Sequence, residues 1–90
     1  MFFTKVPTVD YKEVGKNDVI IDVREVSEYK RGHSPRTKNV PLSKINTFTS
    51  DSRVYVICAS GARSRRATKI LRKKGIDAIN IRGGMLNAKR

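Results

Sequence analysis

Residues 54–64 of this 90-residue chain read Val54-Tyr55-Val56-Ile57-Cys58-Ala59-Ser60-Gly61-Ala62-Arg63-Ser64. Four successive apolar residues are typical of a strand buried on both faces, and such strands belong to parallel sheets. A short loop of small residues follows Cys58, and a basic segment then begins. In open α/β sheets, ligands bind beyond the carboxyl ends of the strands. The stretch therefore predicts a parallel α/β fold with a candidate site at Cys58.

The rest of the chain alternates between strand-like and helix-like segments. We expect strands at 19–23, 39–40 and 78–81, and near 2–6 before Pro7. We expect helices at 25–30 and 62–74, with single turns at 9–14 and 42–45, and with Gly75 ending the longer helix. No repeat or linker interrupts this pattern. It predicts one domain over residues 1–90, with a small central, mostly parallel β-sheet flanked by helices on both faces.

The composition excludes several classes of protein. No apolar run in the sequence approaches the ~20 residues that a membrane helix needs. Polar Thr4 and Lys5 follow the first three residues at once, so no signal peptide is expected. Cys58 is the only cysteine, which leaves no internal disulfide and no cysteine-rich zinc site. We expect a cytoplasmic protein that uses no metal.

The net charge of +12 is concentrated in the second half of the chain. Residues 1–52 carry nine Lys and Arg and seven Asp and Glu, whereas residues 53–90 carry eleven Lys and Arg and one acid, Asp77. A basic helix can be a solvated face, can attract a small anionic substrate, or can bind nucleic acid. No aromatic residue lies within 63–74 and no zinc-finger spacing occurs, which disfavours nucleic acid.

Cys58 itself has two interpretations. A lone cysteine after an apolar strand is commonly a small core side chain. However, small residues at 59–62 let the loop amides turn inward, and such a cradle at a helix N-terminus binds anions and stabilises a thiolate. The thiolate is the nucleophilic form, and Arg63 adds a forked donor suited to oxyanions. The loop therefore favours a nucleophilic cysteine.

Motifs along most of the chain resemble those of the single-domain rhodanese family. Residues 58–64 followed by Ala67 resemble its active-site loop. The other motifs occur in the family's order: Ile21-Asp22-Val23-Arg24-Glu25, Glu28-Tyr29, Gly32-His33, Asn39-Val40-Pro41-Leu42 and Gly83-Gly84-Met85. The resemblance covers about residues 19–86.

The resemblance implies a sulfurtransferase with a small parallel sheet and helices on both sides. Cys58 would take a sulfane sulfur from a small anionic donor, such as thiosulfate or glutathione persulfide, and pass it to a thiol or cyanide acceptor. Splitting the transfer at a covalent persulfide gives two easier steps. The anion and the persulfide would be cradled by backbone amides of the loop, those of Ala59, Ser60, Gly61, Ala62 and Arg63. No cofactor is implied, because sulfur itself is the carried group.

Other polar residues near the motifs have simpler interpretations. Asp22 and Arg24 lie at a strand end, where we expect them to pair and hold loops around the site rather than to react. His33 has no second histidine nearby in the sequence, which favours a turn or capping role after Gly32. Glu28 resembles the family's acidic position.

The chain departs from the family pattern at two places. Residues 34–38 are more polar and more positive than the family's usual segment. Ala88 stands where the family commonly has Trp. Neither departure touches the Cys58 loop.

Two other functions stay open. One is a non-catalytic rhodanese-fold module that binds an acidic protein partner through the basic C-terminal half. The other is a phosphatase or arsenate reductase, since related proteins of those classes use Cys-x5-Arg loops. Here Arg63 lies five residues after Cys58, which gives the shorter sulfurtransferase loop and disfavours phosphatase chemistry.

Overall fold

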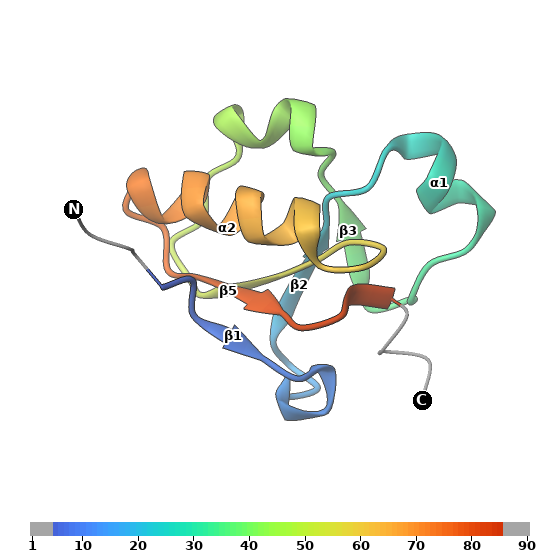
Figure 1. Ribbon diagram of the computed structural model, residues 1–90, viewed down its shortest axis with the longest axis horizontal. Helices are drawn as coiled ribbons and strands as arrows, with labels where there is room; N and C mark the ends of the chain where they lie inside the picture. The colour runs from blue at the N-terminus through green and yellow to red at the C-terminus, as the bar shows by residue number, and fades with distance from the viewer. Residues whose placement is uncertain (1–4, 86–90) are drawn as a thin grey trace.

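The computed structural model describes residues 5–85, and its centre is a sheet of five parallel strands (Figure 1). The strands are β1 (Thr8–Val9), β2 (Val19–Asp22), β3 (Thr37–Asn39), β4 (Val54–Ile57) and β5 (Ala78–Ile81). Their order across the sheet is β1-β5-β4-β2-β3, and every neighbouring pair is parallel. The carboxyl ends of β2, β4 and β5 therefore meet at one edge of the sheet. The predicted α/β fold is confirmed.

The helices lie on both sides of this sheet. They are α1 (Val26–Arg31), α2 (Ala62–Lys73) and two 3₁₀ helices, η1 (Tyr11–Glu13) and η2 (Leu42–Thr47). One core forms where Ala67 and Leu71 of α2, with Ile45 of η2, pack against Val54 and Val56 of β4.

The second core lies on the opposite face of the sheet. There Val14 packs with Ile20, Ile57 and Ile81, and the side chains of Tyr11 and Met85 cover them. The short helix α1 stands beside β3 at the edge of the sheet (Figure 1).

Helix α2 begins and ends at glycines. Gly61 precedes it with φ of 112°, and Gly75 follows its last turn with φ of 90°. Both angles lie in the left-handed region that favours glycine. The predicted helix and its glycine stop are confirmed.

Several boundaries differ from the expectation, most of them by one or two residues. The first strand is expected before Pro7, but β1 follows Pro7, because Thr8 and Val9 are the residues that pair with β5. The edge strand β3 begins at Thr37 rather than Asn39, since Thr37 already lies in register with Ile20 of β2. The expected turn at 42–45 continues to residue 47 as η2. The expected strand residues 2–4 and Ala88 lie outside the described residues.

None of the helices between residues 5 and 85 has the length and apolar character that a membrane crossing requires.

Candidate active site

Cys58 lies directly after β4, and the loop that leads to α2 wraps around its sulfur. The Sγ atom accepts hydrogen bonds from the backbone amides of Gly61 at 3.1 Å and Ser64 at 3.3 Å. The residue is 1% exposed. Cys58 is thus a buried residue whose sulfur accepts one amide from its own loop and one from the first turn of α2.

This environment favours the ionised thiol. Burial raises the pKa of the Cys58 thiol, but its hydrogen bond with the Ser64 hydroxyl and those from the backbone amides of Ser64, Gly61 and Ser60 together outweigh it. The pKa is therefore lowered overall. Hydrogen bonds to a charged form stabilise that form, and the thiolate is the nucleophile of cysteine chemistry.

A buried polar network lies behind the sulfur. The Ser64 hydroxyl lies 3.5 Å from Cys58 Sγ and donates to Asn80 Oδ1 at 2.6 Å. The Asn80 amide nitrogen in turn donates to the hydroxyl of Thr8 at 3.3 Å. When the thiol ionises, the Ser64 hydroxyl can turn its proton from the amide oxygen to the sulfur. Asn80 is not among the site residues predicted from the sequence, although it is a polar residue inside the otherwise apolar strand 78–81.

Arg63 is bound by a carboxylate from α1. Its Nη1 and Nη2 atoms donate to the two carboxylate oxygens of Glu28 at 2.6 and 3.0 Å, with both side chains about one-third exposed. The Arg63 hydrogen bonds, followed by one from the Glu25 amide, lower the pKa of Glu28 to about 2. The fork of Arg63 thus connects the cysteine loop to α1 instead of facing open solvent.

Asp22 and Arg24 form a buried pair at the end of β2. Both Asp22 carboxylate oxygens accept from the Arg24 guanidinium, at distances of 2.9–3.1 Å. Arg24 Nη2 also donates to the carbonyl oxygen of Gly32 at 2.9 Å. The pair therefore fixes the segment after α1 against the carboxyl edge of the sheet.

The segment 83–85 packs directly on the cysteine. The amide of Met85 donates to the Cys58 carbonyl oxygen at 2.7 Å. Gly84 has φ of 56°, and a Cβ atom there would overlap that carbonyl oxygen and lie 2.7 Å from the one of Ala59. A tight glycine turn is therefore required at this position.

His33 lies after Gly32, with its ring stacked on Tyr29 at a centroid distance of 3.6 Å and its Nδ1 atom 2.7 Å from the Tyr29 carbonyl oxygen. The ring thus packs on the end of α1. Between residues 5 and 85, no three or more His, Cys, Asp or Glu side chains form a group that could hold a metal ion.

A parallel α/β sheet with a cysteine in an amide-lined loop at its carboxyl edge is the architecture of the rhodanese-fold sulfurtransferases. The model of the rhodanese-like domain matches residues 9–90, and the chain belongs to that family.

Individual relatives agree with this assignment. The chain is 41% identical over 70 residues to the uncharacterized protein YqhL of Bacillus subtilis, a match that covers 72% of this chain and 56% of YqhL. It is 37% identical over 71 residues to YrkF of the same organism, which is named as a candidate sulfur carrier protein. That match covers 73% of this chain and 38% of YrkF. The chain thus spans about half or less of the length of these two curated relatives.

A solved structure shows the same fold over nearly the whole length of both chains. The crystal structure of a rhodanese-like domain protein from Staphylococcus aureus has a TM-score of 0.77 and 34% sequence identity. The match covers 93% of this chain and 90% of that chain.

Proposed function

We propose that this protein transfers a sulfane sulfur from thiosulfate, or from a similar persulfide donor, to a thiophilic acceptor through a persulfide on Cys58. The observation that carries the proposal is that the Cys58 sulfur, at the carboxyl edge of the sheet, accepts hydrogen bonds from the backbone amides of Gly61 and Ser64. Family membership supports the sulfurtransferase class, and the name of YrkF refers to sulfur carriage.

The reaction divides into two displacements at sulfur. The Cys58 thiolate attacks the outer sulfur of thiosulfate, the sulfur–sulfur bond of the donor breaks, and sulfite leaves with the bonding electron pair. An acceptor thiolate or cyanide then attacks the outer sulfur of the persulfide, and Cys58 leaves as a thiolate. Each step exchanges one sulfur–sulfur bond or converts it to a carbon–sulfur bond, so no oxidant or cofactor is consumed.

The loop amides suit both halves of this reaction. An amide cradle at the start of a helix stabilises negative charge, whether the charge lies on the thiolate, on the incoming anion or on the terminal sulfur of the persulfide. The amides of 59–63 supply this cradle in the proposal, and Gly61 and Ser64 already donate to the sulfur. Cys58 is 1% exposed, so access of the donor to the sulfur is a requirement of this proposal.

The test is sulfur transfer from thiosulfate to cyanide, measured as thiocyanate. We expect Cys58→Ala to abolish the activity and Lys30→Gln, a change at an exposed cation of α1 that makes none of the contacts to the sulfur, to leave it intact. Activity that persists in Cys58→Ala would exclude the assignment. We place the reaction in the cytoplasm, since a lone reduced thiol suits a reducing compartment.

A second candidate function is the docking of an acidic protein partner. Four exposed cations lie on one side of α2 and form no ion pair with the residues described here: Arg65, Arg66, Lys69 and Lys73. Lys69 is three or four residues from each of the other three along the helix, so they lie on one face and form a continuous basic stripe. The stripe begins next to the cysteine loop. Such a stripe raises the association rate of an acidic partner.

Salt separates this function from catalysis. If docking is the function, partner binding falls steeply as ionic strength rises and survives Cys58→Ala. Replacing Arg66 and Lys69 with Gln should weaken partner binding. Turnover of thiosulfate, in contrast, is required only if the protein is an enzyme. Binding that is insensitive to both salt and these two changes would exclude the basic stripe.

A further inference from the structure

A chain of polar side chains runs through the core from the first strand to the cysteine. It passes from Thr8 of β1 through Asn80 of β5 and Ser64 of α2 to the sulfur of Cys58. Asn80 is 2% exposed, and Ser64 is fully buried. Because a buried amide is unfavourable unless it is hydrogen-bonded, the bonds to Thr8 and Ser64 are what hold the Asn80 side chain in the core.

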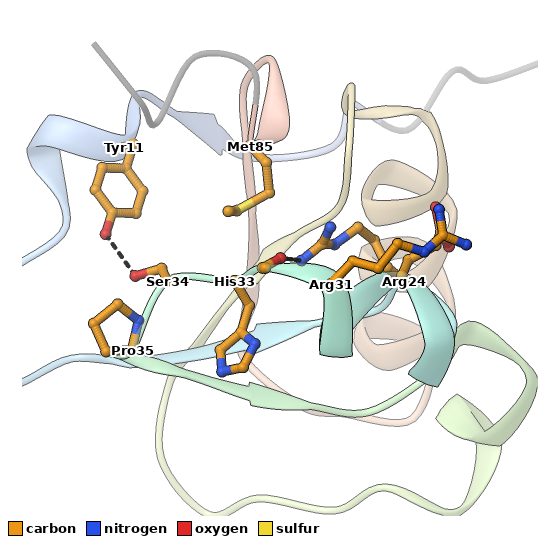
Figure 2. A pocket seen from close by; sticks show the side chains of 9 residues that line it. Tyr11, Arg24, Arg31, His33, Ser34, Pro35 and Met85 are labelled. Atoms are coloured by element: carbon orange, nitrogen blue, oxygen red, sulfur yellow. Dashed lines mark hydrogen bonds between the residues drawn. The ribbon is translucent and has the colours of Figure 1, made fainter.

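This polar chain lies on the face of the sheet that α2 covers, where Cys58 packs in the core with Ala67 and Leu71. The open groove of the molecule is elsewhere. Figure 2 shows that its walls are formed by residues between 11 and 35 and by Met85, and they include the start of the polar segment 34–38. The polar chain is therefore enclosed by protein, and its hydrogen bonds are made between its own members.

The direction of each hydrogen bond in the chain follows from its first member. The Thr8 hydroxyl lies 2.8 Å from the carbonyl oxygen of Val6, which can only accept, so its one proton points there. Toward Asn80 the Thr8 hydroxyl must therefore accept, and only the amide nitrogen of Asn80 can donate to it. The amide oxygen of Asn80 then faces Ser64 and accepts its hydroxyl proton at 2.6 Å.

The Ser64 hydroxyl consequently turns a lone pair, and not its proton, toward the sulfur. Its second acceptor, the Gly61 carbonyl oxygen at 3.1 Å, cannot donate either. The neutral thiol of Cys58 can donate to this lone pair, with 3.5 Å between sulfur and oxygen. A thiolate instead needs the proton of Ser64, so ionisation requires the hydroxyl to turn away from Asn80.

Turning away has different consequences for the two acceptors of Ser64. The Gly61 carbonyl oxygen also accepts from the amide of Arg65 at 3.1 Å, and it keeps this partner. The amide oxygen of Asn80 receives no other hydrogen bond from residues 5–85, so it would be left buried and unpaired. An unpaired buried acceptor is destabilising. Asn80 therefore opposes the ionisation that the Ser64 hydroxyl and the loop amides favour.

We propose that Asn80 is a positioning residue for the reaction of Cys58: it restrains formation of the thiolate by holding the Ser64 proton, and Thr8 keeps its amide in this orientation. The inference rests on the proposed function, since it gives Asn80 a part in the same reaction. No proton passes along the chain, because an amide is not a base; the thiol proton goes to solvent and Ser64 keeps its own. A thiolate of lower pKa is a weaker nucleophile, so the restraint keeps the sulfur reactive.

Charged groups lie on every side of the cysteine, and a neutral substitution at Asn80 leaves them all in place. A change in thiol titration on such a substitution therefore reports hydrogen bonding. These groups are the ion pairs Arg63–Glu28, Arg24–Asp22 and Arg82–Asp10, the basic stripe of α2, and Lys44 of η2.

The test is an ultraviolet titration of the Cys58 thiolate in the full chain, with Cys58→Ala as the blank. Asn80→Val suits a strand but offers no acceptor, so the Ser64 proton is released to turn to the sulfur. At a pH below the midpoint we expect the ratio of thiolate to thiol to rise roughly fivefold, the factor for one net hydrogen bond, and the midpoint to move to lower pH. An unchanged or raised midpoint would overturn the proposal.

A double variant shows whether Asn80 acts through Ser64. In a Ser64→Ala background, Asn80→Val should leave the midpoint unchanged, because no hydroxyl proton remains to be released. Equal shifts in both backgrounds would overturn the proposal. The matched control is Thr68→Val, which removes another buried hydroxyl, one turn further along α2, that donates to the Ser64 carbonyl oxygen at 2.7 Å. A shift as large as that of Asn80→Val would show a general loosening of α2 and would overturn it too.

Thr8→Val is the second variant, should Asn80→Val not fold. It exchanges one hydroxyl for a methyl group at a half-buried position of the edge strand β1. Without its acceptor, the Asn80 amide can reverse and donate to Ser64, which again releases the Ser64 proton, so the midpoint should fall; a midpoint that stays in place would count against the proposal.

These titrations need no sulfur donor, so they separate this inference from the proposed function. A lowered midpoint in a protein that transfers no sulfur contradicts the proposed function and supports the role of Asn80 at the thiol. Sulfur transfer through Cys58 with an unshifted midpoint in Asn80→Val contradicts the role of Asn80 alone.

Discussion

Replacing Gly84 with Ala tests how tightly the turn after β5 packs on the cysteine loop. The new Cβ atom would overlap the Cys58 carbonyl oxygen and lie 2.7 and 2.8 Å from the carbonyl oxygen and carbon of Ala59. All three are backbone atoms, so no side-chain rotation relieves the overlap. A non-glycine residue at φ of 56° costs about 1–2 kcal/mol, and overpacking adds about 1–3 kcal/mol. We expect Gly84→Ala to lower the free energy of unfolding by about 2–5 kcal/mol.

Gly75→Ala is the matched control for this prediction. Gly75 also has a positive φ, of 90°, but a Cβ atom on this residue would have no neighbouring atom within 4 Å. It should therefore carry the backbone cost of about 1–2 kcal/mol alone. Urea unfolding of both variants gives the difference, and the alkylation rate of Cys58 should change only in Gly84→Ala. Equal destabilisation by both substitutions, with unchanged thiol reactivity, would refute the packing argument.

Three further substitutions test the polar contacts. Ser64→Ala should raise the pKa of the Cys58 thiol, because the Ser64 hydroxyl lowers that pKa. The pKa is read from the pH dependence of alkylation, and an unchanged midpoint would contradict the prediction. In Glu28→Gln, the stability difference from wild type should be constant above pH 4.5 and vanish as pH falls through about 2, because the folded-state pKa is lowered; a change near neutral pH would count against the ion pair. Asp22→Ala should cost about 3–5 kcal/mol, because it leaves Arg24 buried without a counter-charge, whereas Asp77→Ala at an exposed pair should cost under about 1 kcal/mol. Similar costs for the two would contradict the role of burial.

The sequence predicts the features that depend on neighbouring residues. Consecutive apolar residues locate β4, small residues locate the loop after Cys58, and the apolar spacing with Gly75 locates α2. These signals are local, because strand burial, loop curvature and helix ends each depend on a few adjacent side chains. Together they are sufficient to place a cysteine at the carboxyl edge of a parallel sheet.

The features that the sequence leaves open depend on contacts between distant segments. The pairing of Arg63 with Glu28 joins residues 35 positions apart, and no periodicity encodes it. Asn80 reaches the site only because β5 lies beside β4. The sequence places the start of β1 too early, because its position is set by pairing with β5 and its own residues carry a weak signal.

The most direct measurement of the central claim is the intact mass of the protein after treatment with thiosulfate and removal of excess donor. The account predicts a gain of one sulfur atom that is mapped to Cys58, is removed by a reducing agent or by cyanide, and is absent from Cys58→Ala. A wild-type protein whose mass stays unchanged while thiosulfate is consumed, or a sulfur atom that is also gained by Cys58→Ala, would contradict it.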